Sequence, residues 1–181
     1  MQRPGKVVVV SQHYPPDQST TAAIMAAIAT HLAQNAEVVV LSGWPGSASA
    51  SPVDRPQVVE IRNWMPEKAA LLKRAAAEVL FTARTFFAVL RRLKPCDVAL
   101  TVTAPFMLPH GVAAAARLKG ARSILILHDL FPDVLVMTGL LKPTSLVARA
   151  IRTINTLLFR ALTAIVVIGR DSEKLLLRYA A

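Results

Sequence analysis

Residues 6–35, KVVVVSQHYPPDQSTTAAIMAAIATHLAQN, contain an apolar run, a polar loop and a helix-like segment, in the order that the rest of the chain repeats. The first of them, KVVVV, is β-branched and apolar after its lysine, which is typical of a strand covered on both faces. SQHYPPDQSTT (11–21) has paired prolines and small polar residues, which predict a loop. Apolar residues then recur at the four-residue spacing of a helix, at Ile24, Ile28 and Leu32.

The alternation of apolar runs and helix-like segments continues along the chain. Further strands are expected at 37–43, 57–62, 97–102, 122–127 and 163–169. Helices are expected at 67–94, at 109–120, from residue 146 onward, and at 170–180. Nearly all-apolar strands that alternate with helices predict an α/β fold: a doubly wound, Rossmann-like parallel sheet with helices on both faces.

The helix expected from residue 146 is strongly amphipathic. Its apolar side chains are expected to form the buried stripe, which consists of Leu146, Val147, Ala150, Ile151, Ile154, Leu157 and Leu158. The other face carries Arg149, Arg152, Thr153, Thr156 and Arg160. We therefore expect the arginine-bearing face to meet water.

Composition limits the domain count and the partners. A chain of 181 residues that is 54% hydrophobic can bury one core, so residues 1–181 are expected to form a single domain. The net charge of +10 favours an anionic partner: nucleic acid, a membrane surface or a phosphorylated substrate. Cys96 is the only cysteine, so no intramolecular disulfide can form and a reducing cytoplasm is the expected compartment. The apolar run behind Lys6 is too short for a signal peptide.

The loops after the first and fifth strands are expected to carry the functional residues, because ligands bind at the carboxyl edge of such sheets. His128 and Asp129 follow strand 122–127 directly. The first loop contains no glycine of a dinucleotide fingerprint, which argues against an NAD-dependent dehydrogenase. Ser19 and Thr20 could hold a phosphate at the start of the first helix, or they could only cap it.

Three segments of the chain carry a family resemblance. They are residues 11–43, with the Tyr-Pro-Pro-Asp loop; HDLFPDVLVMTGLL (128–141); and TAIVVIGRDSEKLLL (163–177). In these segments the chain resembles the amino-terminal domain of GT-B glycosyltransferases of family 4, in the bacterial polysaccharide-building branch. The resemblance covers essentially the whole chain. One departure is the first loop, where QSTTA stands in place of the glycines found in many members.

The resemblance implies one half of a GT-B fold. The donor domain, with the catalytic glutamate pair, is expected to be missing from this chain, which alone is expected to be inactive. The whole protein would be a retaining transferase that moves a sugar from a nucleotide-sugar donor to a glycan or lipid-linked acceptor in cell-surface polysaccharide synthesis. No cofactor is expected. No catalytic residue is expected within the chain itself.

The resemblance and the edge position together suggest binding roles for a few residues. His128 would contact the transferred sugar or its phosphate, or else be a loop histidine bonded to backbone. Asp129 would accept hydrogen bonds from acceptor hydroxyls or brace its loop, and Asp133 is expected to be structural. Tyr14, with the two prolines after it, would form an acceptor wall or a plain turn. His13 and Asp17 are weaker candidates, and no spacing of histidines predicts a metal site.

Basic residues on the expected 67–94 helix suggest a peripheral membrane role. They include Lys73, Arg74, Arg84, Arg91 and Arg92, and large apolar residues accompany them on the same helix. A basic amphipathic surface binds anionic lipid, although the same pattern also fits a solvated helix face. The membrane interpretation would place the protein at the inner face of the membrane. A different class, a nucleic-acid-binding module, has only the net charge in its favour, so nucleic acid is not an expected partner. Another GT-B enzyme, such as a nucleotide-sugar epimerase, or a nucleotide-binding reductase is the closer alternative.

Overall fold

The strands form one parallel sheet. The structure, a computed structural model, describes residues 5–43, 56–67 and 70–179. Its strands are β1 (Lys6–Ser11), β2 (Glu37–Ser42), β3 (Gln57–Glu60), β4 (Val98–Val102), β5 (Arg122–Leu127) and β6 (Ala164–Val167). All neighbours pair in parallel in the order β3-β2-β1-β4-β5-β6. The α/β fold and the parallel sheet predicted from the sequence are therefore confirmed.

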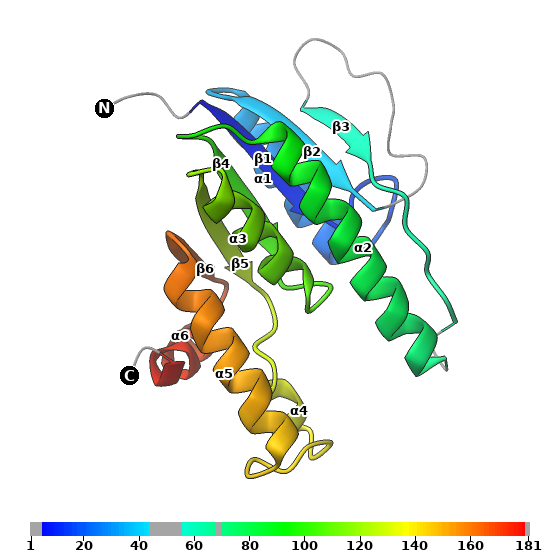
Figure 1. The fold of residues 1–181 in the computed structure, drawn as a ribbon, viewed down its shortest axis with the longest axis vertical. Helices are drawn as coiled ribbons and strands as arrows, with labels where there is room; N and C mark the ends of the chain where they lie inside the picture. The colour runs from blue at the N-terminus through cyan, green and yellow to red at the C-terminus, as the bar shows by residue number, and fades with distance from the viewer. Residues whose placement is uncertain (1–4, 44–55, 68–69, 180–181) are drawn as a thin grey trace.

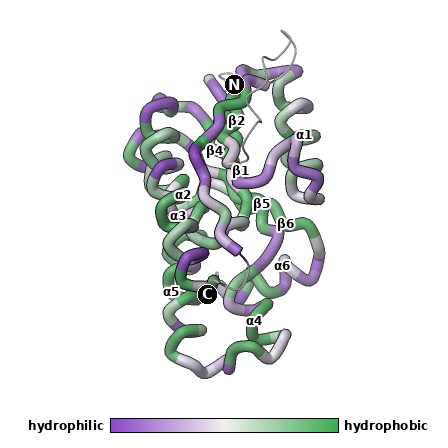
Figure 2. Tube along the Cα trace, turned by 90° about the vertical axis from the view of Figure 1, so that its right-hand side faces the viewer, coloured by the Kyte–Doolittle hydropathy of each residue, from purple (hydrophilic) through white to green (hydrophobic). Residues whose placement is uncertain are grey.

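Helices cover both faces of this sheet. They are α1 (Thr20–Ala33), α2 (Leu71–Arg92), α3 (Leu108–Leu118), α4 (Asp133–Met137), α5 (Leu146–Ala161) and α6 (Arg170–Leu176), and a 3-10 turn, η1 (Leu177–Tyr179), follows. Figures 1 and 2 show α2, α3 and α5 side by side on one face, with α1 on the other. Each of the long helices runs back against the strand direction, so its amino end lies at the carboxyl edge of the sheet (Figure 1).

Alternate residues of the strands supply the two sides of the core. Val8 and Val10 of β1 pack toward α2 and α3, in a cluster that contains the buried ring of Phe81. Val7 and Val9 point the opposite way and pack against Met25 of α1. Because side chains of a strand alternate between faces, a strand buried on both sides must be apolar throughout. This is the physical reason for the unbroken valine run at residues 7–10.

The buried carboxylate of Asp97 joins the beginning of the sheet to the turn before β4. Its Oδ1 accepts a hydrogen bond from the Lys6 backbone N–H at 2.9 Å, and its Oδ2 accepts one from the Lys94 N–H at 2.8 Å. A Cβ atom at Gly5 would lie 2.5 Å from the same Oδ1, so glycine is needed there for close approach. The sequence pattern did not single out Asp97.

Several predicted boundaries differ from the structure. The 67–94 helix begins only at Leu71, and Lys68 and Ala69 lie outside the described residues. The loop predicted after β5 contains the short helix α4. The strand expected at 163–169 is shortened to four residues, and the last helix ends at Leu176 in a 3-10 turn.

The prediction for the buried face of α5 was wrong for most of its residues. The helix buries Ala148, Asn155 and Leu158, of which only Leu158 belongs to the predicted stripe, while Leu146 and Leu157 of that stripe are exposed. A hydrogen bond fixes this orientation, because the side-chain amide of Asn155 donates to the backbone carbonyl of Phe131 at 2.6 Å. A buried polar group must be paired, and this partner is available only on the side that faces α4 and its loop. The apolar periodicity predicted the helix but not the face that packs.

Candidate functional site

Three loops meet at the carboxyl edge of the sheet. They follow β1, β4 and β5, which are adjacent in the sheet. Each contains a cis proline bond, at Pro16, Pro105 and Pro132. His128 and Asp129 lie directly after β5, so their expected position at this edge is confirmed. Residues far apart in the sequence are therefore brought to one place by the sheet order.

The loop after β1 is organised around Asp17. One carboxylate oxygen lies 2.6 Å from Nδ1 of His13 and also accepts the Ser19 hydroxyl at 2.9 Å. The other oxygen accepts the Ser19 backbone N–H at 3.0 Å. Ser19 Oγ in turn accepts the Ala22 N–H and caps α1, which confirms the capping expectation for Ser19. Thr20 is the first residue of α1 and is exposed.

These bonds set the charge of the loop. Burial alone would raise the pKa of Asp17, but hydrogen bonds from the Ser19 backbone and hydroxyl and from His13 outweigh it and lower the pKa below its usual value. The carboxylate is therefore charged throughout the neutral range and holds His13 in a fixed orientation. The Tyr14 carbonyl accepts the Asp17 N–H, which makes the expected turn. The ring of Tyr14 is buried in the α1 side of the core, and burial raises the pKa of its hydroxyl.

A cleft of about 310 Å³ opens beside this loop. It lies between the segments that follow β1 and β3 and the first turns of α2. Its lining residues are Gln12, His13, Trp64, Met65, Pro66, Arg74, Ala77, Glu78 and Pro105. Trp64 is 49% exposed, which leaves much of its indole available to a ligand. An exposed aromatic ring beside a guanidinium, a carboxylate and an imidazole suits a sugar or sugar phosphate, since rings pack on apolar sugar faces while charged groups bind hydroxyls or phosphate.

Of the residues that line the cleft, the sequence suggested only His13 as a ligand-binding candidate, and it missed Trp64, Arg74 and Glu78. Arg74 was predicted to face a membrane, yet it lines the cleft. Trp64 had no predicted role. The available signal was its place just after β3, at the same strand edge as the other loops. Glu78 is held in place because its Oε1 accepts the backbone N–H of Met107.

The loop after β5 is braced by Thr103. The Thr103 hydroxyl oxygen accepts the backbone N–H groups of both His128 and Asp129 at 3.1 Å. Within the described residues, Nε2 of His128 is buried without a hydrogen-bond partner, and the exposed Asp129 carboxylate makes no hydrogen bond. Thr103 therefore does the bracing considered for Asp129. Both side chains have unused hydrogen-bonding capacity, which is exposed for the Asp129 carboxylate and buried for Nε2 of His128.

A narrow cavity of about 10 Å³ lies behind this loop, between α3 and α5. Asp129 and the imidazole of His110 are among its lining residues. Burial lowers the pKa of His110, so this imidazole is neutral at neutral pH. The cavity is too small for a sugar and does not extend the cleft. His110 is therefore a packing residue.

Asp133 has a structural role, as expected. Its carboxylate accepts the hydroxyl of Tyr179 and lies 3.5 Å from Nη2 of Arg152. Burial, and then the neighbouring carboxylate, raise the pKa of Tyr179 well above its ordinary value. These contacts tie α4, α5 and the C-terminal turn together. They also occupy Arg152, which is not available to a ligand in this arrangement.

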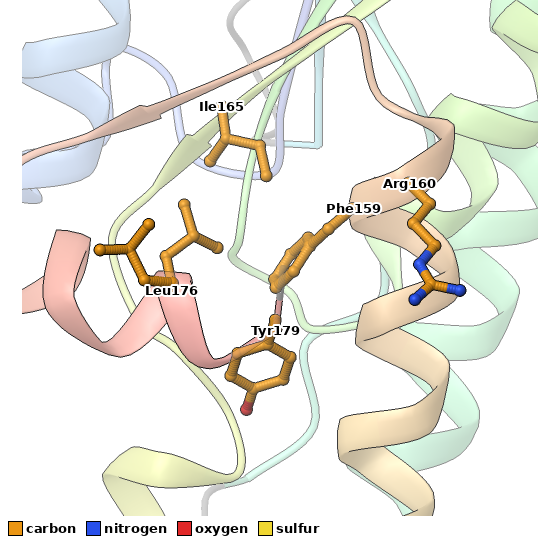
Figure 3. A pocket seen from close by; sticks show the side chains of 6 residues that line it. Phe159, Arg160, Ile165, Leu176 and Tyr179 are labelled. Atoms are coloured by element: carbon orange, nitrogen blue, oxygen red, sulfur yellow. The ribbon is translucent and has the colours of Figure 1, made fainter. Parts of the chain in front are cut away.

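A second cavity of similar size is apolar and lies away from the strand ends. It has a volume of about 350 Å³ and is lined by residues of α5, β6 and the C-terminal turn. Figure 3 shows Phe159, Ile165, Leu176 and Tyr179 around it, with Arg160 at the side. With one charged residue and no acid in its lining, it lacks the groups that bind and orient a sugar phosphate. The more polar cleft beside His13 is the better candidate site.

The basic side chains of α2 do not share one direction. Lys73 and Arg91 are exposed on the outer face of the helix, beside exposed Leu72, Val79 and Phe87. Arg84 and Arg92 are half-buried and donate to the backbone carbonyls of Arg62 and Ala88. The predicted membrane surface is thus limited on α2 to the outer pair, because Arg74 faces the cleft.

Neither a metal cluster nor a membrane span is found in residues 5–43, 56–67 and 70–179. No three His, Cys, Asp or Glu side chains gather there. No helix in those ranges combines the length and the apolar character needed to cross a bilayer.

Comparison with known proteins gives one clear similarity. The chain is 34% identical over 110 residues to the probable glycosyltransferase WbjE of Pseudomonas aeruginosa. The aligned part is 60% of this chain and 27% of that relative, so the chain spans about a quarter of the relative's length. No family model matches the chain. The similarity supports a glycosyltransferase role.

Proposed function

We propose that this chain is the acceptor-binding half of a GT-B glycosyltransferase of family 4. The observation that carries the proposal is the cleft at the carboxyl edge, where Trp64, Arg74 and His13 line one space. The similarity to a probable glycosyltransferase points to the same chemistry. In this proposal the whole protein is a retaining enzyme of cell-surface polysaccharide synthesis.

Each side chain of the cleft has a part in binding the acceptor. The Trp64 indole packs on an apolar face of a sugar ring, an interaction typical of exposed aromatic residues in ligand sites. The Arg74 guanidinium binds an acceptor phosphate or pyrophosphate through two parallel hydrogen bonds. His13, oriented by the charged Asp17, hydrogen-bonds a hydroxyl of the acceptor.

The donor side completes the site in this proposal. His128 and Asp129 belong to the loop after β5, two strands away from the loop of His13. We assign them contacts to the transferred sugar, since both side chains have hydrogen-bonding capacity left over. The nucleotide and the catalytic glutamates are assigned to a donor domain outside this chain. The 181-residue chain alone should therefore bind acceptor but transfer no sugar.

A lipid-linked acceptor fits the position of the cleft. It is bordered by the amino end of α2, whose outer face bears exposed apolar side chains with Lys73 and Arg91. An acceptor whose sugar-phosphate head projects from a bilayer would reach the cleft when this end of the domain rests on the membrane. The proposed location is the cytoplasmic side of the membrane, with peripheral attachment.

Steady-state kinetics of the whole gene product test the proposal. Arg74→Ala should raise KM for the acceptor at least about tenfold, the effect of losing roughly 1.4 kcal/mol of binding, and leave KM for the nucleotide-sugar unchanged. Arg122→Ala is the matched control, since it removes the same exposed group at the start of β5, at the opposite edge of the sheet from the cleft. An unchanged acceptor KM in Arg74→Ala would show that the acceptor binds elsewhere.

A further inference from the structure

The outer face of α5 is an exposed apolar stripe. Leu146 is 80% exposed, Leu157 is 63% exposed, and Val147 and Ile154 are also at the surface. Leu146 and Leu157 lie on the side of α5 opposite the buried Ala148 and Asn155. Val147 and Ile154 lie on the flank between that side and the buried residues. A helix in water normally turns its large apolar residues inward. The stripe is therefore a surface to be covered.

Positive charge borders this stripe, and negative charge is missing from the helix. Arg149 and Arg160 are exposed along one side of it. Between Leu146 and Ala161 the sequence contains no aspartate or glutamate. Arg152 lies on the inner side, bonded to the Pro143 carbonyl and close to Asp133. The free charges of the helix thus stand next to the apolar side chains.

The apolar surface extends beyond α5 at the carboxyl edge. Met137 of α4 and Leu140 in the following turn are exposed, and they precede the first turn of α5. Figures 1 and 2 place α5 on the same face of the sheet as α2, whose outer face carries Lys73 and Arg91. Apolar residues and cations therefore recur over one side of the molecule. A single chance exposure does not account for this arrangement.

We infer that α5 lies flat on an anionic lipid bilayer, with its apolar stripe between the lipid headgroups. Arg149 and Arg160 would contact lipid phosphates, while Val147, Ile154 and Leu157 enter the acyl boundary. Charge complementarity favours lipid over a second copy of the chain. In a two-fold interface built on this helix, the arginines of both copies would come together without a carboxylate from either α5. The inference does not depend on the transferase proposal.

Vesicle sedimentation of the 181-residue chain tests this docking. The probes are vesicles of phosphatidylcholine alone and of phosphatidylcholine with about 30% phosphatidylglycerol. The triple variant Val147→Glu, Ile154→Glu, Leu157→Glu should lower partition onto the anionic vesicles at least about tenfold and remove the salt-resistant part of binding. Arg149→Glu with Arg160→Glu should lower binding at low salt, and the weaker binding that remains should not be released by salt.

Matched controls separate docking from general effects. Leu177→Glu replaces an apolar residue of similar exposure, 65%, in the C-terminal turn, and should bind like the wild type. Lys174→Glu with Arg178→Glu changes the charge by the same amount as the arginine pair, at residues outside α5. Circular dichroism melts confirm that all variants fold.

Two outcomes would overturn the inference. One is equal partition of the wild type and the α5 triple variant onto anionic vesicles. The other is a wild-type chain that is dimeric without lipid and becomes monomeric when the α5 stripe is changed, since a second copy would then be the occupant. Sedimentation equilibrium without vesicles detects that case.

Discussion

Replacing Asp97 should destabilise the fold more than any surface change, because one carboxylate serves two distant backbone donors. Asp97 is only 5% exposed, and its oxygens accept the N–H groups of Lys6 and Lys94. Asp97→Ala leaves both donors without an acceptor. An unsatisfied buried donor costs about 1–3 kcal/mol, and partial access of water reduces this, so a total loss of about 2–4 kcal/mol is expected.

Urea unfolding measures this loss directly. The midpoint should fall while the denaturant slope stays unchanged, which indicates that stability rather than compactness has changed. Asp97→Asn retains one acceptor oxygen and should lose less than Asp97→Ala. Gly5→Ala, whose new Cβ would lie 2.5 Å from Asp97 Oδ1, should also destabilise the protein. If the unfolding free energy of Asp97→Ala were within about 0.5 kcal/mol of the wild-type value, the effect would equal that of an ordinary surface substitution. The two hydrogen bonds to the Asp97 carboxylate would then not stabilise the fold as proposed.

Three further predictions concern the loops and α2. Because the folded-state pKa of Asp17 is lowered, the charged carboxylate stabilises the protein at neutral pH, and this stability is lost as pH falls through about 4 and below. In thermal melts over a pH series, Asp17→Asn should show a smaller fall in Tm at acid pH than the wild type. An equally large fall in Tm in the variant would contradict the lowered pKa. In the whole gene product, His128→Ala should lower sugar transfer at least about tenfold, equivalent to roughly 1.4 kcal/mol of transition-state contact, and an unchanged rate with intact folding would make His128 structural. Lys73→Glu with Arg91→Glu should weaken sedimentation with anionic vesicles at low salt. Arg84→Glu should instead disturb the local structure, because the half-buried Arg84 donates to the Arg62 carbonyl. If the Lys73/Arg91 variant bound vesicles as well as the wild type, α2 would not be part of the docking surface.

The sheet was predictable because its strands are buried on both faces. Such strands need apolar residues at every position, as at Val7–Val10. This pattern can be recognised in the sequence without knowing the tertiary contacts. The position of His128 followed from the same logic, since a residue just after a parallel strand must lie at the carboxyl edge. Helix capping by Ser19 also depends only on local sequence.

The orientation of helices was not predictable from periodicity alone. In α5 the apolar stripe is on the outside, because the bond from Asn155 to the Phe131 carbonyl decides which side packs. On α2, Arg74 and Lys73 are neighbours in sequence but point about 100° apart, so one lines the cleft and the other faces outward. Trp64 joins the cleft only through the path of the segment after β3, which no local pattern specifies.

Fluorescence of Trp64 tests acceptor binding in the cleft most directly. Trp44 is the only other tryptophan, so Trp44→Phe leaves Trp64 as the sole reporter. Titration with a glycan linked to a short polyprenyl pyrophosphate should shift and saturate the emission. Adding Arg74→Ala should raise Kd at least about tenfold, and Arg122→Ala should leave Kd unchanged. Emission that does not respond to the glycan, or a Kd that Arg74→Ala leaves unaltered, would contradict the assignment of this cleft to the acceptor.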